Sequence, residues 1–186
     1  MESQSDNALM RQVQAGDTAQ LAILFERHNV PLFRYLMHLS QNRSVSEDLV
    51  QEVFFRVLKY AGSYDPSFAF NVWLYRMARN CYFDSMHKRR GEVGGHDVDD
   101  VRSEEPLAEE ALARKQDTRF LEEALEKLPE DKREVLVLSR YHNLRYEEIG
   151  QILKCEVGTV KVRVYRAMKE LRERFCELRG ERLYDV

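Results

Sequence analysis

The sequence predicts an all-α protein built from two small helical domains that are joined by a flexible acidic linker. Apolar residues recur at spacings of three and four in the long segments, and no segment shows the strict alternation of a strand. Residues 91–113 contain eight acidic side chains, one basic side chain and three glycines, so this stretch cannot bury enough apolar surface to order itself. We therefore predict domains at 1–90 and 115–186, with a linker at 91–114.

The first domain begins with helices separated by short breaks. Gly16 and Asp17 indicate a helix end and a new N-cap before the apolar segment 21–39. Ser44 and Glu47 fit a capping box ahead of a further helix. The inward face of that helix is expected to hold Leu49, Val53 and Val57.

The segment 61–68 is predicted to be a loop because it contains a glycine and an Asp-Pro pair. An unbroken helix of about five turns is expected over 71–90. Its apolar side chains at helical spacing are Val72, Tyr75, Met77, Ala78, Tyr82 and Met86.

The second domain contains a predicted helix-turn-helix. Pro129 suits the first turn of a helix that continues through 134–142. A short helix at 146–154 and a turn at 154–156 then lead into a long final helix. The second helix of such a unit can lie in the major groove of DNA.

The final helix is predicted to be amphipathic. Its core face, a narrow stripe at 100° per residue, holds Val157, Val160, Val164, Met168, Leu171 and Phe175. The basic side chains point the other way, and Gly150 lies where the two helices must approach closely. A solvated amphipathic helix would also show this pattern, but an exposed Val162 could contact a thymine methyl group and Arg166 could donate to guanine.

Composition argues against catalysis, a bound metal and a membrane anchor. The five histidines lack metal-ligand spacing, no glycine loop suits a phosphate, and three widely spaced cysteines do not make a disulfide framework. We therefore expect no cofactor, no metal and no enzymatic activity. Without an apolar run of about 18 residues or a signal peptide, we expect a cytoplasmic protein with no membrane insertion.

The formal net charge of −3 hides strongly basic stretches. Residues 71–90 contain five basic and one acidic side chain, and 156–180 contain seven basic and four acidic ones. These two stretches also hold motifs that resemble extracytoplasmic-function sigma factors of bacterial RNA polymerase, in the sigma-70 family. EDLVQEVF and WLYRMARN resemble region 2 of that family, VGTVKVRVYRA resembles region 4, and the resemblance covers about residues 6–175.

The resemblance implies a subunit that binds core RNA polymerase and directs it to promoters. Region 4 would read duplex DNA at the minus 35 element through Thr159, Lys161, Val162, Arg163, Tyr165, Arg166 and Lys169. Region 2 would read the unwound minus 10 strand through Tyr64, Phe68, Asn71, Arg76, Arg79, Asn80 and Lys88. Trp73, an aromatic residue at helical spacing, is instead expected to belong to the core.

The resemblance also implies protein partners. The clamp helices of the large catalytic polymerase subunit would contact Asp48, Gln51, Glu52 and Phe55. The flap of the other large subunit and an anti-sigma factor are further candidate partners. The acidic linker would thread towards channels of the polymerase that hold nucleic acid.

Three positions depart from the family pattern. Arg145 stands where Ser or Thr usually caps the helix, Lys154 stands where the turn usually has glycine, and Val162 replaces a common serine. Two alternatives to a sigma factor are a stand-alone helix-turn-helix regulator and an adaptor that binds only protein.

Overall fold

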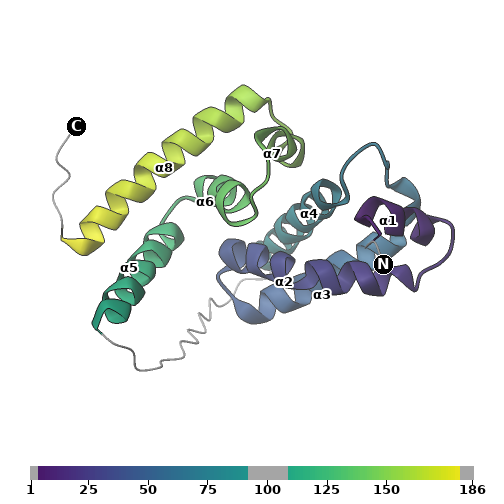
Figure 1. Ribbon diagram of the computed structural model, residues 1–186, viewed down its shortest axis with the longest axis horizontal. Helices are drawn as coiled ribbons and strands as arrows, with labels where there is room; N and C mark the ends of the chain where they lie inside the picture. Colours follow the sequence, from purple (N-terminus) through teal and green to yellow (C-terminus); the bar gives the residue numbers. More distant parts are fainter. Residues whose placement is uncertain (1–3, 92–108, 181–186) are drawn as a thin grey trace.

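The computed structural model describes residues 4–91 and 109–180, and every regular element in those ranges is helical (Figure 1). The first group of helices comprises α1 (Asp6–Gln14), α2 (Gln20–Ser40), α3 (Arg43–Lys59), the 3-10 turn η1 (Ala61–Ser63) and α4 (Phe70–Gly91). The second comprises α5 (Glu109–Glu126), α6 (Glu130–Leu136), the π-helical turn η2 (Val137–Tyr141), α7 (Tyr146–Leu153) and α8 (Val157–Arg179). The predicted all-α class and its two helical domains are confirmed.

The first group packs around one apolar core. The predicted inward face of α3 is confirmed, since Leu49, Val53 and Val57 are all buried. Side chains from α2 and α4 complete this core, and those with less than 2% exposure are Leu24, Leu32, Tyr35, Leu36, Leu39, Phe70, Leu74 and Ala78.

Two predicted helix caps lie elsewhere. Ser44 is inside α3, and the cap is Asn42, whose side-chain oxygen accepts a hydrogen bond from the Val45 backbone N–H at 2.9 Å. Asp17 lies three residues before α2 rather than at its N-cap. Gly16, with φ of 102°, follows the end of α1 as expected.

The second group is built around a buried run at the end of α6 and the start of η2. Six consecutive residues, 133–138, are buried there, and two of them, Arg133 and Glu134, are charged. Helix α5 begins at Glu109, inside the range 91–114 that the sequence assigns to the linker. The rest of that range from residue 92 lies outside the described residues.

Helices α7 and α8 form the predicted helix-turn-helix, and Gly150 permits their close approach. A Cβ atom at Gly150 would lie 2.7 Å from the Cys155 carbonyl oxygen and 3.8 Å from Val160 Cγ2. The first distance is too short for any side chain, so the turn can pack against α7 only if residue 150 is glycine.

The two departures from the family pattern at the ends of α7 are accommodated differently. Lys154 adopts the left-handed conformation with φ of 53°, which costs a non-glycine residue about 1 kcal/mol. Arg145 occupies the N-cap without a side-chain hydrogen bond to the helix, but the Glu148 carboxylate accepts one from the Arg145 backbone N–H at 2.8 Å. Half of a capping box therefore remains.

The two groups of helices pack against each other, with α6 and η2 on α2 and with α7 on α4 (Figure 1). Polar contacts cross this boundary near the end of α2, where Gln41 Nε2 donates to the Glu126 carbonyl at 3.1 Å and Arg133 donates to the Leu39 carbonyl at 3.4 Å. The most buried of these contacts joins Glu134 of α6 to Arg79 of α4, and the Glu134 side chain is only 4% exposed.

Within the described ranges, no helix is both long enough and apolar enough to cross a bilayer. Cys81 is buried and Cys155 and Cys176 are half-buried, and all three are free thiols. Burial raises the pKa of Cys81 to about 11, as expected for an unreactive core thiol.

Candidate nucleic-acid interface

The outward face of α8 carries a row of exposed side chains, because its opposite face is fixed in the core by Val160, Val164, Ala167 and Leu171. Tyr165 is 72% exposed and Val162 is 48% exposed. The row consists of the seven residues expected to read duplex DNA: Thr159, Lys161, Val162, Arg163, Tyr165, Arg166 and Lys169. This face offers four cations for phosphates and both polar and apolar groups for base edges.

A cavity of about 510 Å³ lies between the loop that precedes α4 and the first half of that helix. Phe68, which is 45% exposed, lines it together with Trp73, Arg76 and Asn80. Gln151 of α7 lines the same cavity from the second group of helices. Aromatic side chains beside a guanidinium and an amide suit an unpaired base, which has an apolar face and a hydrogen-bonding edge.

Tyr64 is part of the core, and its burial contradicts the prediction that it contacts an unpaired base. It is 3% exposed, its ring lies 5.2 Å from that of Trp73, and its hydroxyl donates to the Phe68 carbonyl at 2.9 Å. Burial raises the pKa of Tyr64 to about 12. Tyr64 therefore supports the loop from inside, and Phe68 is its exposed aromatic residue.

Arg79 faces the second group of helices rather than an open surface. Its Nε donates to the two carboxylate oxygens of Glu134, at 3.0 and 3.3 Å. The Arg79 guanidinium also lies 4.6 Å from the centre of the Phe83 ring. In this arrangement Arg79 does not serve the DNA strand that the sequence assigned to it.

Glu134 is a buried carboxylate that the two groups of helices share. The Tyr35 hydroxyl donates to it at 2.8 Å, from α2. Burial raises the pKa of Glu134 above its ordinary value, and Arg79 and Tyr35 offset part of that rise. Because Glu134 is buried, removing either Arg79 or Glu134 from this ion pair is expected to weaken the packing of the two groups.

Comparison with protein families identifies both groups of helices. Residues 24–92 match the family model for sigma-70 region 2, and residues 120–171 match that for sigma-70 region 4. The chain belongs to the sigma-70 family. It is a promoter-directing sigma factor of RNA polymerase and neither an enzyme nor a stand-alone regulator.

Several relatives of this sigma factor belong to the extracytoplasmic-function (ECF) group. The ECF sigma factor SigE of Mycolicibacterium smegmatis is 35% identical over 81% of this chain, which spans 59% of that relative's length. The RNA polymerase sigma factor CarQ of Myxococcus xanthus is 33% identical over 85% of this chain and 90% of its own. SigW of Bacillus subtilis, another ECF sigma factor, is 29% identical over 91% of this chain and 96% of its own.

A solved structure of CnrH in complex with the cytosolic domain of CnrY resembles this sigma factor, with a TM-score of 0.69 and 25% identity. The match covers 91% of this chain and 96% of CnrH. The similarity extends over both helical groups.

The α3 residues expected to contact the polymerase share one exposed surface of this sigma factor. Asp48 and Gln51 are exposed, and Phe55 is 61% exposed although it is a large apolar residue. Glu52 is half-buried and its carboxylate lies 2.6 Å from Arg56 Nε.

The remaining residues expected at the minus 10 strand lie along α4. Arg76, Asn80 and Lys88 are exposed, and Asn71 is half-buried in the first turn of the helix. The Asn71 side-chain oxygen accepts a hydrogen bond from the Val72 backbone N–H at 2.8 Å. No local sequence pattern indicates the roles of Glu134, Asn7 and Gln14, because their partners lie more than 40 positions away.

Proposed function

We propose that this sigma factor recognises promoters in the cytoplasm through two surfaces on two helical groups. The row on α8 binds minus 35 duplex DNA, and the loop before α4 captures an unpaired base of the minus 10 strand. The observation that carries this proposal is the cavity of about 510 Å³ beside Phe68, Arg76 and Asn80, in the same chain as the exposed α8 row. Binding energy separates the DNA strands, and no covalent bond is broken.

Within the α8 row, Arg166 is the principal reader of guanine, and Val162 meets a thymine methyl group or excludes other bases. Thr159, Tyr165 and the cations Lys161, Arg163 and Lys169 act mainly on the DNA backbone and set the salt dependence.

Arg166→Ala is expected to cost about 1 to 3 kcal/mol of binding free energy at one base pair of the minus 35 element, because a bidentate contact to guanine is lost. Holoenzyme binding to duplexes carrying each single base change would measure this. Lys169→Ala is the matched control, and it should weaken all duplexes equally while reducing the salt slope. Unchanged base preference in Arg166→Ala would contradict the assignment.

Phe68→Ala is expected to weaken binding to the unwound minus 10 strand by about 1 to 3 kcal/mol, the usual contribution of one stacked base. Permanganate reactivity of promoter thymines, with core polymerase present, should fall accordingly. Binding to a minus 35 duplex should not change, since Phe68 lies in region 2. Loss of both activities together would point to misfolding instead.

The remaining surfaces bind protein. Asp48, Gln51, Glu52 and Phe55 dock on the clamp helices of the large catalytic subunit, and region 4 contacts the flap of the other large subunit. The acidic linker, between domains 1–90 and 115–186, lies along the polymerase channel. An anti-sigma factor is a further candidate partner, since the similar protein CnrH has been solved in complex with another protein, the cytosolic domain of CnrY.

The two helical groups must separate before both promoter elements can be read. Elements centred near minus 35 and minus 10 are about 85 Å apart along B-form DNA at about 3.4 Å per base pair. In the packed arrangement, Gln151 of α7 lines the same cavity as Arg76 and Asn80. The packed arrangement therefore belongs to the free protein.

The proposed function is tested by run-off transcription with purified core polymerase on a pool of genomic fragments. Specific transcripts, with permanganate-reactive thymines only when both proteins are present, would support it. If core polymerase does not bind the chain, the proposed function is wrong.

A further inference from the structure

The loop that carries Phe68 is held by side chains of α1, which lies more than 40 residues before it in the sequence. Gln14 Nε2 donates to the Ala61 carbonyl at 3.0 Å and to the Tyr64 carbonyl at 2.8 Å. One carboxamide thus joins the two ends of η1. The Ala61 carbonyl also accepts from the Tyr64 backbone N–H at 3.0 Å, so Gln14 adds to a turn that the backbone already closes.

Asn7 holds the other end of the loop in the same way. Its Nδ2 donates to the Pro66 carbonyl at 3.3 Å and to the Phe68 carbonyl at 3.1 Å. Its Oδ1 accepts from the Phe70 backbone N–H, the first of α4, at 2.9 Å. Ala69, just before α4, has no side-chain oxygen to cap the helix, so Asn7 supplies that cap from another element.

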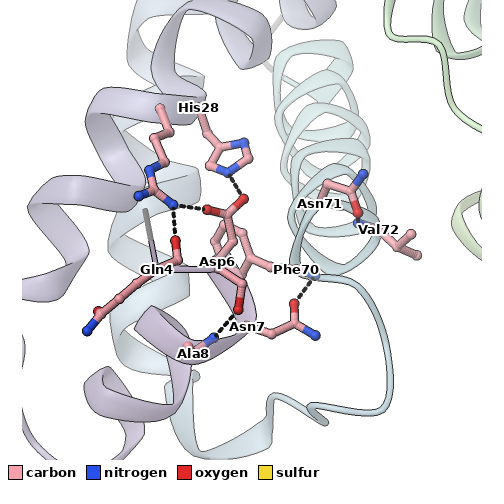
Figure 2. Close-up of polar contacts among 10 residues, drawn as sticks. Gln4, Asp6, Asn7, Ala8, His28, Phe70, Asn71 and Val72 are labelled. Carbon is pink, nitrogen blue, oxygen red and sulfur yellow. Dashed lines mark hydrogen bonds and ion pairs between the residues drawn. The ribbon is translucent and has the colours of Figure 1, made fainter. Parts of the chain in front are cut away.

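Helix α1 is itself fixed to α2, so it can act as a rigid support. Figure 2 shows Asp6 turned towards His28, while the adjacent Asn7 points to Phe70 at the start of α4. The Asp6 carboxylate lies 2.7 Å from both Arg27 Nη1 and His28 Nε2. On the same face of α1 as Asp6, at i+3, i+4 and i+7, the side chains buried in the core are Leu9, Met10 and Val13.

We propose that Asn7 and Gln14 are positioning residues for the minus 10 contact: they fix the loop so that Phe68 and the cavity beside it are formed before DNA arrives. This inference rests on the proposed function, in which the loop captures an unpaired base. Neither residue touches the base, and both act through the loop backbone.

The physical basis is the entropy of the loop. A free surface loop must be ordered when it binds, and that cost reduces affinity. Here Asn7, Gln14 and the Tyr64 hydroxyl hold the carbonyls of Ala61, Tyr64, Pro66 and Phe68 in the free protein. The loop is therefore already ordered before DNA binds. None of the free energy of the base contacts is used to order it, so all of it contributes to affinity.

The test uses holoenzyme assembled from the full chain and core polymerase, with fork-junction promoter DNA whose minus 10 strand is unpaired. Asn7→Ala removes three hydrogen bonds and Gln14→Ala removes two, and each variant should weaken binding at least about tenfold. Gln12→Ala is the matched control, a change at a glutamine of the same helix outside these contacts, and it should bind as the wild type does.

An abasic nucleotide at each minus 10 position separates positioning from general destabilisation. At the captured position, wild type and both variants should bind equally weakly, because a positioned loop has no base to hold. A tenfold loss that persists on abasic DNA, or that Gln12→Ala also shows, would overturn the proposal. If wild-type binding is insensitive to every abasic position, base capture itself is wrong.

A third variant distinguishes the cap on α4 from the grip on the loop. Asn7→Asp keeps an acceptor for the Phe70 N–H but loses the donor to Pro66 and Phe68. In the free protein, hydrogen exchange at the Phe70 amide should quicken about tenfold in Asn7→Ala and stay slow in Asn7→Asp. Both variants should bind fork DNA weakly, and wild-type binding by Asn7→Asp would refute the positioning role of the loop contacts.

Discussion

Arg79→Ala is expected to weaken the packing of the two helical groups by about 3 kcal/mol, because it leaves the Glu134 carboxylate buried without its cation. This is the lower end of the range for breaking a buried ion pair, since the Arg79 side chain is 31% exposed and that of Glu134 is 4% exposed. Small-angle scattering should show a larger radius of gyration. Urea unfolding should change from one transition towards two.

Arg76→Ala is the matched control for this experiment, because Arg76 is an exposed arginine one turn away on the same helix. It should leave both the scattering and the unfolding curve unchanged. The double variant with Arg79→Met and Glu134→Leu should recover most of the packing, since apolar residues often replace a buried ion pair without loss. A compact Arg79→Ala protein would show that other contacts hold the groups together.

The consequence for function follows from the position of α7, whose Gln151 lines the cavity beside Phe68 in the packed arrangement. If the groups separate to expose that cavity, as proposed above, each kilocalorie that stabilises packing must be offset by binding to polymerase and promoter. Arg79 would take part in minus 10 binding only after the two groups have separated and its ion pair with Glu134 has broken. The sequence assignment of Arg79 to DNA therefore applies to the separated form.

Helix positions could be predicted from the sequence because they depend on local periodicity. The stripe on α8 was correct at Val160, Val164 and Leu171, which are buried. It was wrong at Met168, which is 38% exposed, while the neighbouring Ala167 is fully buried. Helices α5, α6 and α7 all pack on α8, so their arrangement decides which of two adjacent residues faces inward.

The candidate site was predictable where a residue's exposure follows from its helix face, as for the α8 row. It was not predictable for Tyr64, because its burial depends on α1 and α4 folding over the same loop. Ser44 illustrates a local failure: it matched a capping box, but Asn42 two residues earlier has the extended backbone that a cap needs. Nothing in the local sequence distinguishes Glu134 from the other charged residues of α6, because its partners lie 55 and 99 residues away.

Acidification is expected to separate the two groups through His142, which lies at their boundary. Its Nδ1 is 2.7 Å from the Tyr75 hydroxyl, and its ring centre is 5.0 Å from that of Tyr75. Burial, together with the nearby His38 and Arg34, lowers the pKa of His142 to about 4. Burial beside Arg133 also lowers the pKa of His38.

The sign follows from proton linkage. A histidine whose pKa is lower in the packed form than its ordinary value near 6.5 binds more protons when the groups separate, so packing is fully stable above that value and weakens as the pH falls towards 4. Glu134 opposes this effect, because burial raises its pKa and its protonation favours the packed form. Because Glu134 is present in the wild type and in each histidine variant, its contribution to the pH dependence cancels when they are compared.

His142→Asn should therefore flatten the loss of packing between pH 6.5 and 4, measured by scattering and by the urea midpoint at each pH. Asparagine places a polar group near the position of Nδ1, so it keeps a partner for the Tyr75 hydroxyl without a group that titrates in this range. The control is His87→Asn at an exposed position of α4, which should retain the wild-type pH profile. If His142→Asn separates on acidification as the wild type does, protonation elsewhere drives the opening.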